Sequence, residues 1–295
     1  MTQGDLAEKI YGDRSHTPNI YSTLQALVCN GCISRQGSRP AYYSLTGESI
    51  QKQEEMPSPI FRQPNKISDK AIDSVICAAK KYYQYTHDDE NGRYRSWEHC
   101  YSEFAKARRT QSEEYDRLSL HLAFYLASWG MYRGSSFLLQ KDYRIHIPAV
   151  KMILDPKFDV LLGMDCSELK DRSNQKLIEE LGIAMGEYYN SIRKSIETKQ
   201  NTKHEISTIL ITKILLGTLG CVPAYDQFFV KGIRKLHIAS GTYQMKSLLQ
   251  LADFYDKNAK SLEDCRAELR IADSNLQYPQ MKLLDMGFWQ IGIDD

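Results

Sequence analysis

The sequence lacks long hydrophobic runs, a surplus of charge of one sign, and an even number of cysteines. No segment has enough consecutive apolar residues to cross a bilayer, and Met1 is followed by a polar, acidic stretch rather than a signal peptide. The 38 Lys and Arg residues balance 37 Asp and Glu residues, so net charge favours neither an acidic partner nor a membrane surface. Seven scattered cysteines argue against a disulfide framework and indicate a reducing compartment. We therefore expect a cytoplasmic protein without membrane association.

Several motifs that carry chemistry are also missing. The chain has no P-loop, no GxGxxG and no GxSxG. Cys29 and Cys32 have CxxC spacing, but a tetrahedral zinc site needs two further ligands and no second CxxC or HxxxH exists. We expect His99 and His121 to be the least exposed histidines, and a lone histidine on an apolar helix is more often a core residue than a ligand. The sequence therefore predicts no metal and no cofactor.

Composition and proline spacing predict two domains. Hydrophobic residues make up 42% of the 295 residues and charged residues 25%, which is ordinary for a globular protein. Residues 47–67 contain Pro57, Pro59 and Pro64 among polar residues and are predicted to be a linker. A small domain over residues 1–46 and a larger one over residues 68–295 follow from this boundary.

The first 46 residues show a regular succession of elements. Apolar residues share one face of a predicted helix in residues 2–12, and the same spacing recurs in residues 16–31, where Pro18 lies in the first turn. Residues 32–37 and 41–45 are predicted to form two short strands that close a hairpin. The predicted order is helix, turn, helix, hairpin.

This order resembles a winged helix-turn-helix domain, in which the second helix and the hairpin contact DNA. The resemblance implies double-stranded DNA as a partner, with helix side chains at base edges and wing arginines at phosphates or in the minor groove. The residues that it assigns to DNA are Ser15, His16, Asn19 and Tyr21 on the helix, and Arg35 and Arg39 on the wing. Residues 1–60 carry five cations and six acids, which favours an alternative use of the domain as a protein-interaction module.

The larger domain is predicted to be all-α, because apolar residues recur at helical spacing and no alternating strand appears after residue 67. Residues 113–131, apolar nearly all round from Leu118 onward, are expected to form the centre of the core. The predicted helices cover residues 69–83, 97–109, 113–131, 135–143, 148–154, 174–196, 205–217, 224–236, 244–258, 262–272 and 278–290. The fold class is therefore mainly α, with a small α+β winged helix before an all-α domain.

Residues 211–229 combine an apolar helix with a single cation, a glycine-containing turn and an early acid in the next helix. This stretch distantly resembles the helix-hairpin-helix of base-excision DNA glycosylases. The resemblance implies that Gly217 and Gly220 form a phosphate-binding hairpin, that Lys213 is a nucleophile and that Asp226 is the supporting carboxylate. The alternative is an ordinary helical corner, with Lys213 snorkelling and Asp226 at a helix N-terminus.

Residues 129–136 place an aromatic ring, a cation and two glycines between two apolar helices. A tight corner explains the glycines, but Arg133 beside the helix start at Ser135 and Ser136 is also a candidate anion site for DNA.

The preferred interpretation is a DNA-binding protein in which a winged helix is joined to a helical effector domain. The effector would supply dimerisation, ligand sensing or catalysis, and a homodimer is one expected assembly. The alternatives are a DNA glycosylase or lyase that uses Lys213 and Asp226, and a protein-interaction module without nucleic acid.

Overall fold

The computed structural model describes residues 33–36, 42–45, 66–196 and 206–294, apart from residues 273 and 275. Contacts divide the chain into two compact units, Met1–Gln63 and Pro64–Asp295. The two helices expected before the hairpin, the CxxC cysteines and most of the expected linker lie outside the described residues.

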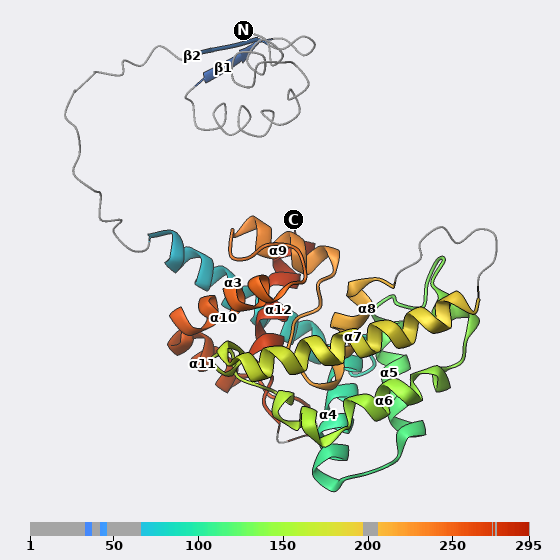
Figure 1. The fold of residues 1–295 in the computed structure, drawn as a ribbon. Coiled ribbons are helices and arrows are strands. Elements are labelled where there is room, and N and C mark those ends of the chain that lie inside the picture. Colours follow the sequence, from blue (N-terminus) through green and yellow to red (C-terminus); the bar gives the residue numbers. More distant parts are fainter. Residues whose placement is uncertain are drawn as a thin grey trace. The chain divides into compact units, whose positions relative to one another are not determined.

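The described part of the first unit is a two-stranded antiparallel sheet. Strand β1 (Ile33–Gln36) pairs with β2 (Tyr42–Leu45), and Ile33 lies opposite Leu45 (Figure 1). This is the hairpin that the sequence predicts for residues 32–45.

The second unit is helical, which confirms the prediction of a mainly α protein. No strand occurs in residues 66–196 and 206–294. The first half contains α3 (Lys66–His87), α4 (Arg95–Thr110), α5 (Tyr115–Ser128), the short 3-10 helices η2 (Phe137–Gln140) and η3 (Tyr143–His146), α6 (Ile147–Ile153), and the 3-10 helices η4 (Pro156–Leu161) and η5 (Glu168–Lys170). The second half contains α7 (Arg172–Lys194), α8 (Thr208–Thr218), α9 (Gln227–Lys235), α10 (Met245–Lys257), α11 (Ala259–Glu268) and α12 (Gln280–Ile293).

The helices form two groups, and α7 runs across the front of the unit in the view of Figure 1 and packs against α6 and α8. In one group, α12 packs against α3 and α9, with α10 and α11 beside them. In the other, α5 packs against α4, α6 and α8. The first and last helices of this unit are therefore neighbours, which brings residues far apart in the sequence to the same place.

The most buried helices are α8 and α12, so the expectation that residues 113–131 form the centre of the core is wrong. Leu120 and Phe124 of α5 are 52% and 60% exposed, whereas every residue from Leu210 to Thr218 in α8 is buried. Helix α12 is buried from Gln280 to Gln290. A helix packed on all sides needs neighbours on all sides, and the sequence of α5 alone does not reveal that one of its faces has none.

Two close helix contacts depend on glycine. A Cβ atom on Gly232 of α9 would lie 1.9 Å from the carbonyl oxygen of Phe288, and one on Gly292 of α12 would lie 1.9 Å from that of Phe228. Because backbone atoms meet there, no side-chain movement would relieve the overlap. These two positions bring the backbones of α9 and α12 together.

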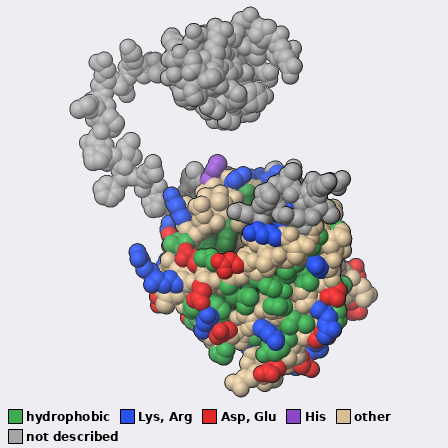
Figure 2. Space-filling view, turned by 45° about the vertical axis from the view of Figure 1, so that its right-hand side comes forward, with side chains coloured by type: hydrophobic (Ala, Val, Ile, Leu, Met, Phe, Trp, Pro, Cys, Tyr) green, Lys and Arg blue, Asp and Glu red, His purple; other side chains and the backbone are tan. Residues whose placement is uncertain are grey.

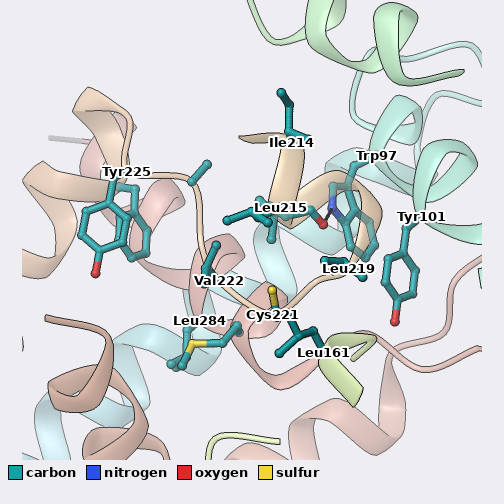
Figure 3. Close-up of a cluster of buried hydrophobic side chains, with 14 of the residues drawn as sticks. Trp97, Tyr101, Leu161, Ile214, Leu215, Leu219, Cys221, Val222, Tyr225 and Leu284 are labelled. Atoms are coloured by element: carbon teal, nitrogen blue, oxygen red, sulfur yellow. Dashed lines mark hydrogen bonds between the residues drawn. The ribbon is translucent and has the colours of Figure 1, made fainter. Parts of the chain in front are cut away.

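Aromatic and aliphatic side chains fill the space between α4, α8 and the segment after α8. The Trp97 and Tyr101 rings stack 4.9 Å apart, and the Trp97 indole N–H donates to the carbonyl of Leu216 at 2.9 Å. Figure 3 shows Cys221 and Val222 between these rings on one side and Tyr225 on the other. The polar edge of Trp97 thus finds an acceptor while its faces are buried.

Within the described residues, no helix has both the length and the apolar character that a bilayer crossing requires.

Candidate functional site

Lys213 and Asp226, the two catalytic candidates, form a buried ion pair. The Lys213 ammonium donates to Asp226 Oδ2 at 3.0 Å, and the two side chains are 3% and 14% exposed. The ammonium also lies 5.3 Å from the centre of the Trp129 ring. An ammonium inside α8 would be costly without a partner, so the carboxylate and the ring face together make its position tolerable.

Asp226 has a second role as the N-cap of α9. Its Oδ1 accepts the backbone N–H groups of Phe228 and Phe229, both at 3.1 Å. One carboxylate oxygen of Asp226 therefore stabilises the start of α9, and the other accepts a hydrogen bond from Lys213. The helical-corner interpretation is therefore right about Asp226 at a helix N-terminus, but its expectation that Lys213 snorkels is wrong, because the ammonium is buried against Asp226.

A second buried pair, which the sequence analysis did not single out, lies on α12. Lys282 donates to Asp285 Oδ2 at 2.8 Å, and Asp285 Oδ1 accepts the N–H of Ala224 at 3.0 Å. The Lys282 ammonium lies 4.7 Å from the Tyr82 ring centre and 5.0 Å from that of Trp97. Burial lowers the pKa of Lys282, and Asp285 opposes this. The signal in the sequence was a lysine and an aspartate three residues apart in an otherwise apolar helix.

Four aromatic rings, those of Tyr82, Tyr94, Trp129 and Trp289, pack against one another next to these pairs. Trp129 stacks with Tyr82 at 6.3 Å and meets the edge of Trp289 at 5.4 Å, while Tyr94 contacts both tryptophans at 5.5 and 5.9 Å. They come from α3, the start of α4, the end of α5 and α12, so only the fold brings them together. The Trp129 indole N–H donates to the Ser96 hydroxyl at 3.2 Å, and this hydrogen bond fixes the orientation of the Trp129 ring.

A pocket of about 370 Å³ opens beside Lys213 and Asp226. We refer to it as the open pocket. It is lined by Arg93, residues 127–133, Ile209, Lys213, residues 226–228 and Trp289. Its volume lies in the range of small-molecule sites, and its walls combine aromatic faces with cations.

A second, much smaller space lies between the two ion pairs. This inner cavity of about 10 Å³ shares Trp129, Lys213, Asp226 and Trp289 with the open pocket, and Lys282 and Asp285 also line it. Its size is close to that of a single water molecule. Polar groups therefore continue inward from the open pocket.

Two exposed arginines line the open pocket. The Arg93 guanidinium lies 5.4 Å from the ring centres of both Tyr94 and Trp129. Arg133 lines both the open pocket and a neighbouring pocket of about 290 Å³. The expected helix start beside Arg133 is only the 3-10 helix η2, and the Ser136 hydroxyl already caps it by accepting the N–H of Leu138 at 3.3 Å.

Gly217 and Gly220, assigned to a phosphate-binding hairpin, lie in the core. A Cβ on Gly217 would lie 2.4 Å from the Tyr125 ring, and one on Gly220 would lie 2.5 Å from Pro279. Gly220 has a φ of +66°, which glycine adopts without strain. All residues from 210 to 225 are buried. This burial gives both glycines a packing role and places their backbone out of reach of a phosphate.

The winged-helix candidates are largely beyond the described part of the chain. Ser15, His16, Asn19, Tyr21 and Arg39 lie outside it. Arg35 lies in β1, where its Cα pairs with that of Tyr43. The hairpin thus places Arg35 on a strand of the expected wing.

The expected burial of the histidines is corrected by the structure. His99 is exposed and His121 is partly exposed, whereas His146 at the end of η3 is fully buried. His146 lies between Ile145 and Ile147 in a segment that also contains Tyr143, Arg144 and Pro148, and no apolar helical stripe marks it in the sequence. In the described ranges, no three His, Cys, Asp or Glu side chains gather in a way that would hold a metal ion.

Charged side chains of both signs are interspersed on the described surface that Figure 2 shows, around hydrophobic side chains. A broad basic face, which is the usual footprint of duplex DNA binding, is not seen on that face of the helical unit. The cations at the open pocket are a local feature.

Comparison with known protein families, with curated proteins and with solved structures finds no match to this chain.

Proposed function

We propose that the protein is DNA-associated and that its helical unit binds one unstacked nucleotide of a nucleic acid in the open pocket. The observation that carries this proposal is the Lys213–Asp226 pair on the wall of a pocket that also presents aromatic rings and arginines. This role corresponds to the effector function predicted for the larger domain.

The chemistry of the pocket supports a nucleotide. The partly exposed Trp129 lines the pocket and carries a ring of the kind on which a base stacks, and such stacking contributes about 1–3 kcal/mol per base. Arg93 and Arg133 supply cations for phosphate groups. A base that leaves its stack to enter a pocket is read by the side chains at the pocket's wall, here Lys213 and Asp226.

The first unit would hold duplex DNA through its winged helix. The β1–β2 hairpin supports this assignment, since a wing is a two-stranded hairpin after the second helix. Arg35 and Arg39 would contact phosphates or the minor groove, and Ser15, His16, Asn19 and Tyr21 would read base edges.

Full-length protein should bind a short single-stranded oligothymidylate and a mixed-sequence duplex, with affinities measured by fluorescence anisotropy across a salt series. We expect the double variant Arg93→Gln/Arg133→Gln to weaken single-strand binding about tenfold. If each arginine contacts one phosphate, the salt slope should fall by about 1.4, at 0.7 per phosphate. Arg35→Gln/Arg39→Gln should instead weaken duplex binding.

The matched control is Arg109→Gln, which removes one exposed cation from the end of α4 away from the pocket. It should leave single-strand binding within twofold of wild type. Equal losses in all three variants would indicate nonspecific charge attraction and contradict the pocket assignment. If the wild-type protein binds neither nucleic acid, the DNA-binding proposal is contradicted and the protein-interaction alternative is the one that stands.

A second candidate function is base excision, which the 3.0 Å contact of Lys213 with Asp226 beside the pocket favours. One Lys213 ammonium proton would pass to Asp226 Oδ2, the amine would attack C1′ of the sugar, and the glycosidic bond would break with its electron pair leaving on the base, which takes that proton from Asp226. The C1′–O4′ bond would then open to give an imine, with an amine proton passing to O4′. Asp226 would stabilise positive charge that develops on the sugar.

Borohydride reduction tests this activity directly, because it converts an enzyme–sugar imine into a stable crosslink. With an oligonucleotide that contains an abasic site, wild type should form a crosslinked species on a denaturing gel and Lys213→Met should form none. Lys282→Met is the control, since it removes the other buried ammonium, which lies behind the open pocket. Crosslinking by Lys213→Met would exclude Lys213 as the nucleophile, and no crosslinking by wild type would leave the pocket as a binding site only.

A further inference from the structure

His146 lies between two tyrosine hydroxyl groups. Its Nδ1 is 2.6 Å from Tyr189 Oη, and its Nε2 is 2.7 Å from Tyr132 Oη. His146 and Tyr189 are completely buried. Tyr132 is partly exposed and lines the open pocket. The three side chains form a hydrogen-bonded chain, the Tyr–His–Tyr relay, that runs from the core to the pocket.

The protons in this relay can be counted. Burial lowers the pKa of His146 to about 4, so its imidazole is neutral at neutral pH. Burial also raises the pKa of Tyr132 to about 12, so that phenol keeps its proton. A neutral imidazole donates from one nitrogen and accepts at the other. The relay therefore has two orientations, which differ in the direction of both hydrogen bonds.

One orientation leaves a buried hydroxyl hydrogen without an acceptor. If His146 Nδ1–H donates to Tyr189, the Tyr189 hydroxyl must donate elsewhere. Within the described part of the chain, His146 is the only hydrogen-bond partner that Tyr189 Oη has. An unpaired buried hydroxyl is costly compared with an arrangement that pairs it, so this orientation is disfavoured.

In the other orientation, every buried hydrogen-bonding group of the relay has a partner. Tyr189 donates its hydroxyl hydrogen to Nδ1, and Nε2–H donates to Tyr132 Oη. The hydroxyl hydrogen of Tyr132 is then uncommitted, on a residue at the wall of the open pocket. In this orientation Tyr132 can act as a donor toward a bound molecule, whereas in the reverse orientation its hydrogen is used by His146.

We infer that Tyr132 is a specificity-determining hydrogen-bond donor of the open pocket, held in that role by His146 and Tyr189. It selects a ligand that presents an acceptor oxygen or ring nitrogen to it. This inference rests on the proposed function only for the identity of that ligand, a nucleotide. The acceptor then belongs either to the base or to the phosphate.

The relay is tested first in the free, full-length protein by ¹⁵N NMR of its histidines, with His146 assigned from the spectrum of His146→Gln. We expect a neutral ring protonated at Nε2, with Nδ1 accepting a hydrogen bond, at pH 6–8. In Tyr189→Phe the Nδ1 partner is lost, and the ring should become a mixture of both tautomers. A wild-type ring protonated at Nδ1 would overturn the inference.

Ligand selection is tested with a short oligothymidylate, which carries base carbonyls and phosphates, and with the same strand in which tetrahydrofuran units replace the nucleosides. Tyr132→Phe should weaken oligothymidylate binding about tenfold, and Tyr189→Phe about threefold although Tyr189 does not line the pocket. A loss confined to oligothymidylate assigns the acceptor to the base, and an equal loss for both strands assigns it to phosphate.

The matched control is Tyr188→Phe, which removes a hydroxyl from the neighbouring residue of α7. Tyr188 donates to the carbonyl of Ile145 and takes no part in the relay. The Tyr188→Phe variant should bind both strands like wild type, and its His146 should keep the wild-type tautomer. Unchanged binding in Tyr132→Phe would overturn the donor role. If wild type shows the Nε2–H tautomer but binds neither strand, the relay is supported and the proposed nucleotide ligand is overturned.

Discussion

At the scale of single residues, the helical unit is distinguished by two ammonium groups inside its core. Lys213 and Lys282 are 3% and 2% exposed, and each lies within 3.0 Å of an aspartate and over a tryptophan ring. Burying an ion pair rarely stabilises a fold more than well-packed apolar residues would. Both pairs line the inner cavity, and their presence is weak evidence for added stability.

His146 provides a pH test at the same scale. Its pKa is lowered to about 4 by burial, whereas an unfolded chain protonates histidine near pH 6.5. Between these values the unfolded state binds one more proton, so stability is complete above pH 6.5 and falls as pH decreases to 4. At 1.36 kcal/mol per pKa unit, the full loss is about 3 kcal/mol.

Urea unfolding at pH 7 and at pH 4.5 would measure this dependence. His146→Gln should be less stable than wild type at pH 7 but should lose roughly 2–3 kcal/mol less on acidification. His99→Gln, at an exposed site, is the control and should keep the wild-type pH dependence. An unchanged dependence in His146→Gln would show that burial does not lower the pKa of His146 in the folded protein.

At the scale of elements, α12 determines how the helical unit assembles. It packs against α3 and α9, and it carries Lys282, Asp285 and Trp289. Gly232 and Gly292 allow the backbones of α9 and α12 to meet. The N-terminus of α9, with Asp226 as its cap, is positioned against α8 as a result. The geometry of the site therefore depends on a helix contact that is made without side chains.

Gly232→Ala should destabilise the protein by about 3 kcal/mol or more, because its methyl group would collide with a carbonyl oxygen that cannot move alone. Gly186→Ala in α7 is the matched comparison, since nothing lies within 4 Å of its added Cβ atom. Replacing that helical glycine should stabilise the protein by about 0.5–1 kcal/mol. Urea unfolding of both variants checks the contrast, and similar stabilities would contradict the close α9–α12 contact.

At the scale of the whole molecule, each proposed activity belongs to a separate unit. The hairpin of the first unit supports duplex contact, and the open pocket of the second supports a single nucleotide. Because each unit has its own compact set of contacts, the arginine variants of one should leave the binding property of the other intact. This independence makes the salt-series experiment able to separate the two proposals.

The sequence by itself determined the local features of the chain. Helical periodicity predicted the α-helices of the larger unit, although residues 135–143 hold only the 3-10 helix η2 and the start of η3. β-Strand residues around a turn predicted the hairpin, and a lone lysine in the apolar helix α8 marked Lys213. Asp226 was recognisable because an acid just before an apolar run suits a helix N-terminus. These features depend on neighbours along the chain, which a sequence displays directly.

Only the tertiary structure decided which distant residues meet. It placed Lys282 and Asp285 of the last helix beside Lys213, moved the centre of the core from α5 to α8 and α12, and buried His146 between two tyrosines. It also gave Gly217 and Gly220 a packing role. The physical reason is that burial and side-chain pairing depend on which helix faces meet, and helical periodicity gives each helix its apolar face but not the partner of that face.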